Sequence, residues 1–334
     1  MGKIEVSVYC LAYNHEKYIR KALDGFISQK TSFEYEVFVH DDASTDNTAS
    51  IIKEYADKYP NIIKPIFQIE NQYSRGQKIV KNIILPKMHG KYVAICEGDD
   101  YWTDSAKLQR QYDALESHPE CSISTHRTGC CNEDGSYNER IIPCINIGLD
   151  ENIVLSQDEF AHYIWQKGYI FHTSSYFIRR EVFDIPLDLA RDEGLIRKSL
   201  IMGGVFYYSD IMSMRRLWTV GNFNSRLKSE GFAGRMRLLL SNMDNDIKVN
   251  EYTEGKYDYL ILPSLFMSVL YWGWYNPQYA KEYIAEHCLY LHRVWRFLSI
   301  KQKVKGTIKY VLLYVFPKGL EKYYMTRNKQ TSAG

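Results

Sequence analysis

Short apolar runs alternate with amphipathic stretches along the first 125 residues of the chain. The runs "IEVSVYCLAYN" and "YEVFVH" end in polar turns, a pattern typical of buried strands. The stretches "HEKYIRKALDGFISQ" and "NTASIIKEYADKYP" follow them and place their apolar residues on one helical face. The runs "IIKPIFQIEN" and "GKYVAIC" repeat the strand pattern, with a helix expected from Lys78 to Met88 between them. This alternation predicts a parallel sheet flanked by helices.

The pattern changes after a helix expected from Lys107 to His118. The segment "CSISTHRTGCCNEDGSYNERIIP" predicts two antiparallel strands joined by a turn at 133–135. The later segment "IFHTSSYFIRREVF" predicts a strand and the start of a helix, and the periodicity beyond Gly234 is mostly helical. We therefore expect an α/β domain over residues 1–232 and a helical C-terminal region over residues 233–334.

Acidic residues gather where the expected strands end. The strand ends at Asn14, Asp42 and Asp99 should share one edge of the sheet, and the turns "HDDASTDNT" and "CEGDDYW" bring several carboxylates there. Carboxylates this close repel one another unless a cation or hydrogen-bond donors satisfy them. Mg²⁺ or Mn²⁺ takes one or two protein carboxylates and completes its shell with water and substrate phosphates. One such turn alone would be explained better as a helix N-cap, but two on one edge favour a metal-dependent nucleotide-diphosphate site.

Charge is distributed unevenly along the chain. The 42 Lys and Arg and 40 Asp and Glu give a net charge of +2, yet ten of the basic residues and only Glu321 among the acids lie from Arg293 onward. One face of an expected tail helix is apolar and is flanked by Lys301, Lys305 and Lys309. The apolar positions are Ile300, Val304, Ile308, Val311, Leu312 and Val315. This helix suits an anionic membrane surface, the alternative being a helix packed on the catalytic domain with solvated lysines.

The remaining composition narrows the setting. The acidic body contains no nucleic-acid-binding motif, so a nucleic-acid partner is not expected. The first residues, "MGKIEVSVYC", show no apolar leader, so we expect the seven cysteines to be reduced in a cytoplasmic protein. A zinc site from Cys121, Cys130, Cys131 and Cys144 with His118 or His126 lacks any C-x-x-C pair and is the weaker explanation of these thiols. No apolar run approaches the roughly 18 to 20 residues of a spanning helix.

Three segments together resemble the family 2 glycosyltransferases. They are "VSVYCLAYN", "EVFVHDDASTDNT" and "GKYVAICEGDDYWTDSAKLQRQ", and the likeness is specific over residues 4–125. The resemblance implies the GT-A fold, a Rossmann-like mixed sheet flanked by helices, and a nucleotide-sugar donor. The "CEGDDYWTD" form resembles the bacterial branch that builds capsule, O-antigen and other surface polysaccharides. Ser105 stands where Pro is often found in that branch.

The same resemblance implies roles for residues at the donor site. Ala12 and Tyr13 would pack on the base and ribose, and Asp42 would hydrogen-bond the base ring. The acids Glu97, Asp99 and Asp100 would stand for the family's D-x-D motif, with Asp99 near the ribose or metal and Asp100 on the metal. Glu97 in place of Asp is a departure from the motif. Trp102 would wall the donor sugar, or else cap the core.

Basic residues and the catalytic base are assigned in the same way. Arg75 lies where the family brings a basic residue towards the diphosphate, although solvated surface charge explains it slightly better. Asp192 in "ARDEGLIRKSL" matches the position of the family's base, and Glu193 is selected if the count starts from Tyr208. Arg216 in "MSMRRLWTVGNFNSR" would lie near the phosphates, but Arg215 replaces the family's Tyr and the expected His is absent.

We therefore expect an inverting, metal-dependent glycosyltransferase that uses Mn²⁺ or Mg²⁺. Its donor would be a nucleotide sugar, with UDP expected on family precedent, and its acceptor a glycan or lipid-linked glycan at the inner face of a bacterial plasma membrane. An acceptor hydroxyl is a poor nucleophile, so a carboxylate must take its proton as the new bond forms. The alternative is a non-catalytic nucleotide- or glycan-binding relative. A nucleotidyltransferase would need a glycine-rich basic first loop, which "CLAYNHEKY" does not provide.

Overall fold

A computed structural model describes residues 3–143, 150–167, 171–217, 219, 229–272, 277–286 and 293–315. Its contacts divide the chain into two compact units, residues 1–160 with 169–229 and residues 161–168 with 230–334. The sequence placed the boundary after residue 232 and assigned 161–168 to the first region.

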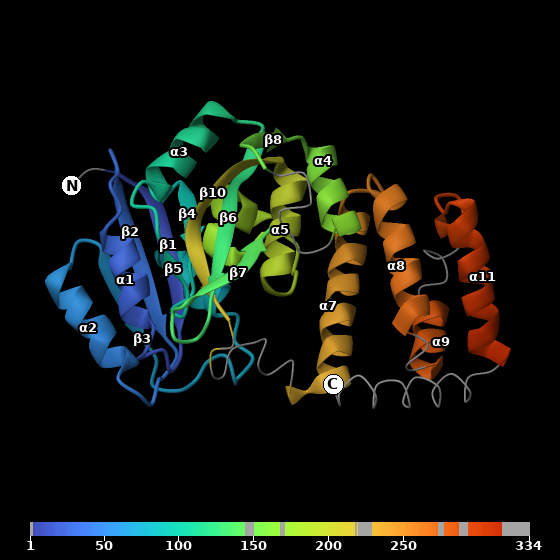
Figure 1. Ribbon diagram of the computed structural model, residues 1–334, viewed down its shortest axis with the longest axis horizontal. Helices are drawn as coiled ribbons and strands as arrows, with labels where there is room; N and C mark the ends of the chain where they lie inside the picture. The colour runs from blue at the N-terminus through green and yellow to red at the C-terminus, as the bar shows by residue number, and fades with distance from the viewer. Residues whose placement is uncertain are drawn as a thin grey trace. The chain divides into compact units, whose positions relative to one another are not determined.

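The first part of unit 1 is a parallel sheet, as the alternating pattern predicts. Strands β1 (Ile4–Ala12), β2 (Glu34–Asp41), β3 (Ile63–Phe67) and β4 (Tyr92–Ile95) lie in the order β3-β2-β1-β4, and each neighbouring pair is parallel. Helices α1 (Ile19–Ile27) and α2 (Thr48–Lys58) lie side by side along it (Figure 1). Almost every residue of β1, β2 and β4 is buried, because both faces of these strands are covered.

The core of this unit joins the sheet to α1. Its fully buried members include Val6, Val8 and Cys10 of β1, Val37 and Val39 of β2, and Ile19, Leu23 and Phe26 of α1. The helix expected from Lys78 to Met88 is shorter and irregular: a π turn, η1 (Val80–Ile84), runs into a 3₁₀ turn, η2 (Leu85–Lys87). Pro86 lies in this segment, and its missing N–H prevents a regular helical ladder.

The rest of the sheet is mixed, which brings residues from distant parts of the chain to β4. Strand β9 (Phe177–Arg179) lies between β4 and β6 (Cys121–Cys131) and is antiparallel to both. Strand β10 (Gly204–Arg216) is parallel to β6, and β5 (Tyr101–Trp102) pairs antiparallel with its end. The edge strand β8 (Ile153–Leu155) also pairs with β10. The full order is β3-β2-β1-β4-β9-β6-β10-β5. Because β5 follows the acidic loop after β4 and pairs with β10, that loop lies near the end of β10.

The expected hairpin and the flanking helices are present. Strand β7 (Tyr137–Ile142) pairs antiparallel with β6, and Gly135 supplies the positive φ of 88° in the turn. Helix α3 (Lys107–Ser117) ends one residue before the expected limit and packs on β6, β9 and β10. Helix α5 (Arg191–Met202) packs on β6 and β10, and α4 (Gln157–His162) follows β8.

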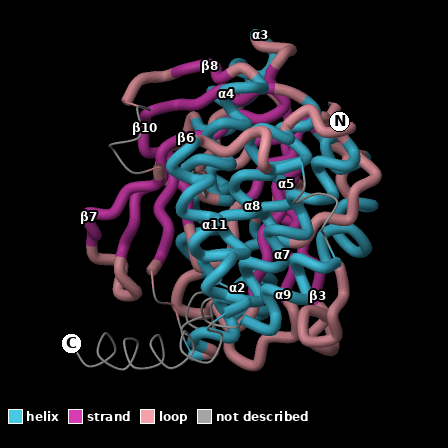
Figure 2. The backbone as a smooth tube through the Cα atoms, turned by 90° about the vertical axis from the view of Figure 1, so that its right-hand side faces the viewer, coloured by secondary structure: helices cyan, strands magenta, loops and turns pink. Residues whose placement is uncertain are grey.

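Unit 2 is helical, as the periodicity beyond Gly234 predicts. It contains α7 (Gly231–Tyr252), α8 (Asp258–Trp272), α9 (Pro277–Glu286) and α11 (Ile300–Val315), drawn as cyan helices in Figure 2. The π turn η4 (Tyr163–Lys167) packs on α8. Its Trp165 Nε1 donates to Asp246 Oδ1 over 2.8 Å. In the part of the chain that the structure describes, no helix is both long and apolar enough to span a bilayer.

Candidate functional site

Three loops meet where β1, β2 and β4 end, and backbone hydrogen bonds tie them together. The N–H of Asp42 donates to the carbonyl of Ala12 over 2.9 Å, and the N–H of Gly98 donates to the carbonyl of Leu11 over 2.9 Å. Asn14 Oδ1 accepts from the N–H of Thr45 over 2.8 Å. The structure therefore brings the three predicted strand ends together.

Glu97, Asp99 and Asp100 form a compact acidic cluster in the loop after β4. One oxygen from each lies within 4.8 Å of the others. Asp99 and Asp100 are 7% and 3% exposed. Burial, followed by the charges of neighbouring acids, raises the pKa of both Glu97 and Asp100 well above the usual range. A bound cation would offset this repulsion, so the three carboxyl groups fit a divalent metal ion.

Donors at the end of β10 and just after it bond two of these acids. The N–H of Arg216 donates to Asp100 Oδ1 over 2.8 Å, and Thr219 Oγ1 donates to Asp99 Oδ2 over 2.9 Å. Arg216 Nε donates to the carbonyl of Asp99 over 3.2 Å. Sequence reasoning missed Thr219, because only the pairing of β10 with β5 brings it to the loop after β4.

The helix-cap alternative does not account for these acids. Helix α2 begins after Asn47, and Asp46 Oδ1 accepts from the N–H of Thr48 over 2.9 Å. Helix α3 begins after Ala106, and Asp104 Oδ1 accepts from the N–H of Ala106 over 2.8 Å. Asp46 and Asp104 therefore bond the helix starts. The acids Glu97, Asp99 and Asp100 are not needed as helix caps.

Tyr13 and Asp42 differ in their surroundings at the expected base and ribose site. The Tyr13 side chain is 45% exposed at the end of β1 and is free to stack on a ring, whereas Ala12 is buried. Asp42 is 5% exposed, and its two carboxylate oxygens accept from the N–H groups of Gln72 and Tyr73 over 2.7 and 3.0 Å. These bonds fix the loop after β3 beside the site.

The basic residues of that loop lie in ion pairs. The exposed guanidinium of Arg75 pairs with Glu70, and Lys78 pairs with Asp188. In this structure neither side chain is bonded to the acidic cluster. Contact of Arg75 with a diphosphate stays a prediction.

Asp192 and Glu193, the two candidates for the catalytic base, interact with different groups. Asp192 lies in the first turn of α5, and burial together with the charge of Glu193 raises its pKa to about 6. The charge of Asp192 in turn contributes to the raised pKa of Glu97, after burial, which is consistent with Asp192 lying in the neighbourhood of the acidic cluster. Glu193 instead pairs with Arg191, whose Nε lies 3.6 Å from Glu193 Oε2. Arg191 has a φ of 58°, so this helix start is strained.

The structure favours the second of the two roles expected for Trp102, and its neighbour Tyr101 is buried as well. They are 7% and 4% exposed, and the ring of Trp102 packs edge-on against Phe26 with 4.9 Å between centroids. Trp102 Nε1 donates to the carbonyl of Ser174 over 3.0 Å. The expectation that Trp102 lines the donor sugar is therefore wrong in this structure, because its ring caps the core.

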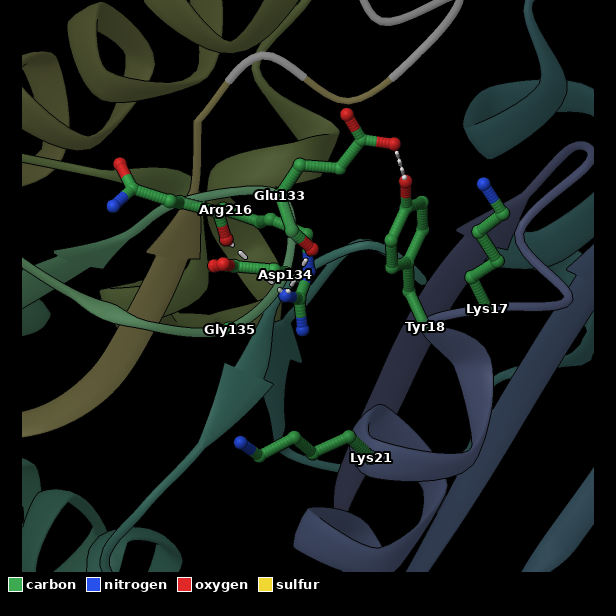
Figure 3. Close-up of a pocket in the computed structure, with 8 residues that line it drawn as sticks. Lys17, Tyr18, Lys21, Glu133, Asp134, Gly135 and Arg216 are labelled. Carbon is green, nitrogen blue, oxygen red and sulfur yellow. Dashed lines mark hydrogen bonds between the residues drawn. The ribbon is translucent and has the colours of Figure 1, made fainter.

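A cavity of about 690 Å³ opens beside Arg216. Lys17, Tyr18 and Lys21 line one side, and the turn at 132–135 lines the other (Figure 3). The guanidinium of Arg216 lies 4.8 Å from the centre of the Tyr18 ring, and its Nη1 donates to the carbonyl of Glu133 over 2.9 Å. Arg216 thus links this cavity to the acidic cluster through its own backbone.

The thiols do not form a metal site in the described residues. Cys10, Cys96, Cys121, Cys130 and Cys131 are buried and unpaired. Among the residues that the structure describes, the acidic cluster is the one group of three or more metal-binding side chains close enough to share an ion. Cys144, part of the zinc alternative, lies outside the described residues.

The strand ends and the acidic loop of the site lie within a segment that matches a known family. The sequence profile described as "Glycosyl transferase family 2" matches residues 7–185, which is more than half of the chain. The chain belongs to glycosyl transferase family 2. This family 2 member is 44% identical over 138 residues to an uncharacterized protein of Mycobacterium tuberculosis, a match that covers 41% of this chain and 39% of that one. The match thus spans about two fifths of that relative's length.

A functionally named relative is more distant. The Escherichia coli protein WfaP, a UDP-Glc:alpha-D-GlcNAc-diphosphoundecaprenol beta-1,3-glucosyltransferase, is 32% identical over 112 residues, or 34% of this chain and 41% of WfaP.

Two solved structures share the fold of this family 2 member. TarS of Staphylococcus aureus, residues 1–349 in complex with UDP, superposes with a TM-score of 0.63 at 17% identity and covers 97% of this chain and 92% of that one. The mannosyltransferase PcManGT of Pyrobaculum calidifontis, in complex with GDP-Man and Mn²⁺, gives a TM-score of 0.52 at 18% identity, covering 93% and 85%. The predicted GT-A fold is confirmed.

Proposed function

We propose that the protein is an inverting, metal-dependent glycosyltransferase with a nucleoside-diphosphate sugar as donor. The single observation that carries the proposal is the cluster of Glu97, Asp99 and Asp100 where β1, β2 and β4 end. The charge of the buried Asp192, which contributes to the raised pKa of Glu97, supports it. A lone acidic loop is compatible with simple binding, but a separate carboxyl group whose charge acts on the loop would supply the base that sugar transfer needs.

The reaction assigns a task to each group. An acceptor hydroxyl oxygen forms a bond to the anomeric carbon while the bond from that carbon to the phosphate oxygen breaks, and its electron pair leaves with the nucleoside diphosphate. The Asp192 carboxylate takes the hydroxyl proton as the bond forms. Asp99 and Asp100, with Glu97 beside them, would hold a divalent ion, Mn²⁺ or Mg²⁺, which offsets the charge of the departing phosphates when bound.

The names of two relatives and the exposed face of α11 support a proposal for the acceptor and the setting. WfaP is named for transfer to a diphosphoundecaprenol-linked sugar and TarS for poly(ribitol-phosphate), so we propose a glycan or lipid-linked glycan acceptor in bacterial surface polysaccharide synthesis. We propose a cytoplasmic protein bound peripherally to the inner face of the plasma membrane. On α11, Ile300, Val304 and Ile308 are 82%, 56% and 55% exposed, which supports this placement.

Calorimetry tests the donor site. UDP, GDP, dTDP and CMP are titrated into the protein with and without Mn²⁺. We expect one nucleoside diphosphate, UDP, to bind and to require the metal, and Asp100→Asn to remove the metal requirement together with most of the affinity. Failure of all four nucleotides to bind would overturn the donor-site assignment.

Activity then separates the proposed enzyme from a non-catalytic binding protein. Donor hydrolysis or transfer is compared for the wild type, Asp192→Ala and Glu193→Ala. The proposal expects Asp192→Ala to bind UDP normally and to lose at least about 100-fold in rate. Nucleotide binding with no turnover in the wild type would favour the binding protein.

A further inference from the structure

A buried histidine approaches the acidic cluster from a segment that the proposed mechanism does not use. His172 lies just before β9, is 6% exposed, and its Nε2 is 3.7 Å from Asp100 Oδ2. The segment 172–175 is fixed from the other side, because Trp102 Nε1 donates to the carbonyl of Ser174. An imidazole nitrogen is therefore held next to a carboxylate that the proposed function assigns to the metal.

Buried hydroxyl groups fix the other ring nitrogen. His172 Nδ1 lies 2.9 Å from Ser174 Oγ, which is 2.8 Å from Ser213 Oγ, itself 3.1 Å from Thr128 Oγ1. In this structure the N–H of Ser174 also donates to the same ring nitrogen, over 3.4 Å. All three hydroxyl-bearing residues are fully buried, so the chain Thr128–Ser213–Ser174 must satisfy its own hydrogen bonds. A metal ion on Nε2 requires the tautomer with its proton on Nδ1, and Ser174 Oγ, 2.9 Å away, is placed to accept that proton.

The separation between Nε2 and Asp100 suits a shared cation better than a hydrogen bond. At 3.7 Å the contact exceeds the length of a normal N–H···O bond. Two ligands on one ion with bonds of about 2.1 Å lie about 3.0 Å apart when adjacent and about 4.2 Å apart when opposite. The observed separation falls between these limits.

We propose that His172 is a ligand of the metal ion through Nε2, alongside Asp100. Metal-binding histidines usually donate their second ring N–H to a protein acceptor, and Ser174 Oγ occupies that position here. Imidazole nitrogen suits Mn²⁺ better than Mg²⁺, which prefers oxygen ligands. The site therefore selects Mn²⁺ over Mg²⁺. This inference rests on the metal dependence in the proposed function.

Pulsed electron paramagnetic resonance of bound Mn²⁺ tests the inference without any assay of activity. The protein is loaded with Mn²⁺ and UDP, and the spin-echo modulation from directly bound ¹⁴N is recorded. His172→Asn keeps an amide near the Nδ1 position for Ser174 but has no atom at Nε2. His118→Gln is the matched control. The ring nitrogen Nδ1 of His118 lies 2.9 Å from the carbonyl of Ala114, in α3 and not at the acidic cluster. We expect the ¹⁴N signal in the wild type and in His118→Gln and its loss in His172→Asn.

Affinities give a second readout. We expect the ratio of Mn²⁺ to Mg²⁺ affinity to fall about tenfold or more in His172→Asn. Mn²⁺ binding to the wild type without ¹⁴N modulation, or with modulation that persists in His172→Asn, would overturn the role of His172 and leave the metal-dependent function standing. No Mn²⁺ binding to the wild type would overturn both. If His172→Asn does not fold, the wild-type spectrum alone decides.

Discussion

At the scale of single residues, Asp192 and Glu193 are adjacent acids in different surroundings. Burial and the charge of Glu193 raise the pKa of Asp192 to about 6, while Glu193 pairs with Arg191. A base must be deprotonated to accept a proton, so we expect kcat/KM to fall with decreasing pH below about 6. Because Glu193 contributes to the raised pKa, Glu193→Gln should move this fall to lower pH.

The measurement is the pH profile of kcat/KM for the wild type and Glu193→Gln, with Asp192→Asn as the inactive reference. Asp192→Asn should lose about 100-fold to 10,000-fold in rate at neutral pH. A pH profile that is the same in Glu193→Gln as in the wild type would contradict the coupling between the two acids. A larger loss in Glu193→Gln than in Asp192→Asn would make Glu193 the base.

Residues in short sequence motifs could be predicted, and residues that reach the site from elsewhere could not. Asp42, Asp99 and Asp100 follow apolar strands directly, so their place at one sheet edge follows from the strand pattern. His172 and Thr219 reach the same acids only because β9 inserts between β4 and β6 and β10 runs past β5. The polar run "HTSS" inside an apolar segment was the one available signal for His172.

At the scale of secondary-structure elements, α3 begins with a lysine that the fold buries completely. Lys107 is 0% exposed, its Nζ donates to Gln111 Oε1 over 2.7 Å, and it lies 4.2 Å from the centre of the Trp102 ring. Burial lowers the pKa of Lys107 from the ordinary 10.5 to about 7. Between these values the unfolded chain carries a proton that the folded chain has released.

This difference makes the stability of the protein depend on pH. The contribution of Lys107 to the free energy of unfolding should rise with pH between about 7 and 10.5, by at most about 1.4 kcal/mol per pH unit. Lys107→Met lacks the titrating amine, so its stability should not show this dependence on pH. Urea unfolding at about pH 7, 8 and 9 should therefore show the free energy of unfolding of the wild type rising relative to that of Lys107→Met. A difference that stays constant over this range would contradict the lowered pKa.

The sequence predicted those strands and helices that are long enough to show a periodic pattern of apolar residues. The strands β1 to β4 and the helices α1, α2 and α3 have apolar periods long enough to be read. The two-residue strand β5 and the three-residue strand β8 have no period of their own and were not predicted. They form because β10 offers them a partner. The irregular η1–η2 segment replaced a predicted helix because Pro86 interrupts it.

At the scale of the whole molecule, the alternation of strands and helices predicted the parallel part of the sheet, and the family resemblance implied a mixed sheet, but neither gave the order of the strands. Strand order depends on which edges remain free once the first four strands have paired, and β9 pairs antiparallel with β4 at one such edge. The sequence also left open whether the tail helix binds a membrane or packs on protein. In the structure α11 packs on α8 within unit 2, and Gly306 lies against Phe266.

The packing of α11 on α8 leaves an apolar stripe of α11, formed by Ile300, Val304 and Ile308, exposed to solvent. At 100° per residue, Gly306 lies nearly opposite Val304 and Ile308, so a close contact through Gly306 exposes the stripe. Lys301 and Lys305 are exposed beside it. Each lysine near an anionic surface adds about 1 kcal/mol of attraction, and each buried CH₂ adds about 0.8 kcal/mol. We therefore expect α11 to bind bilayers that contain anionic lipid.

Sedimentation with vesicles tests this expectation. The full chain should bind vesicles containing phosphatidylglycerol, bind neutral phosphatidylcholine vesicles much more weakly, and lose binding as salt rises. Val304→Asp with Ile308→Asp should reduce binding at least about tenfold, since both lost apolar contacts and added negative charge oppose it. The matched control is Asn61→Asp with Ile69→Asp, which adds the same charge and removes the 97% exposed Ile69 in unit 1. Equal loss in both double variants would show that net charge alone governs binding and that the stripe on α11 is not the membrane contact.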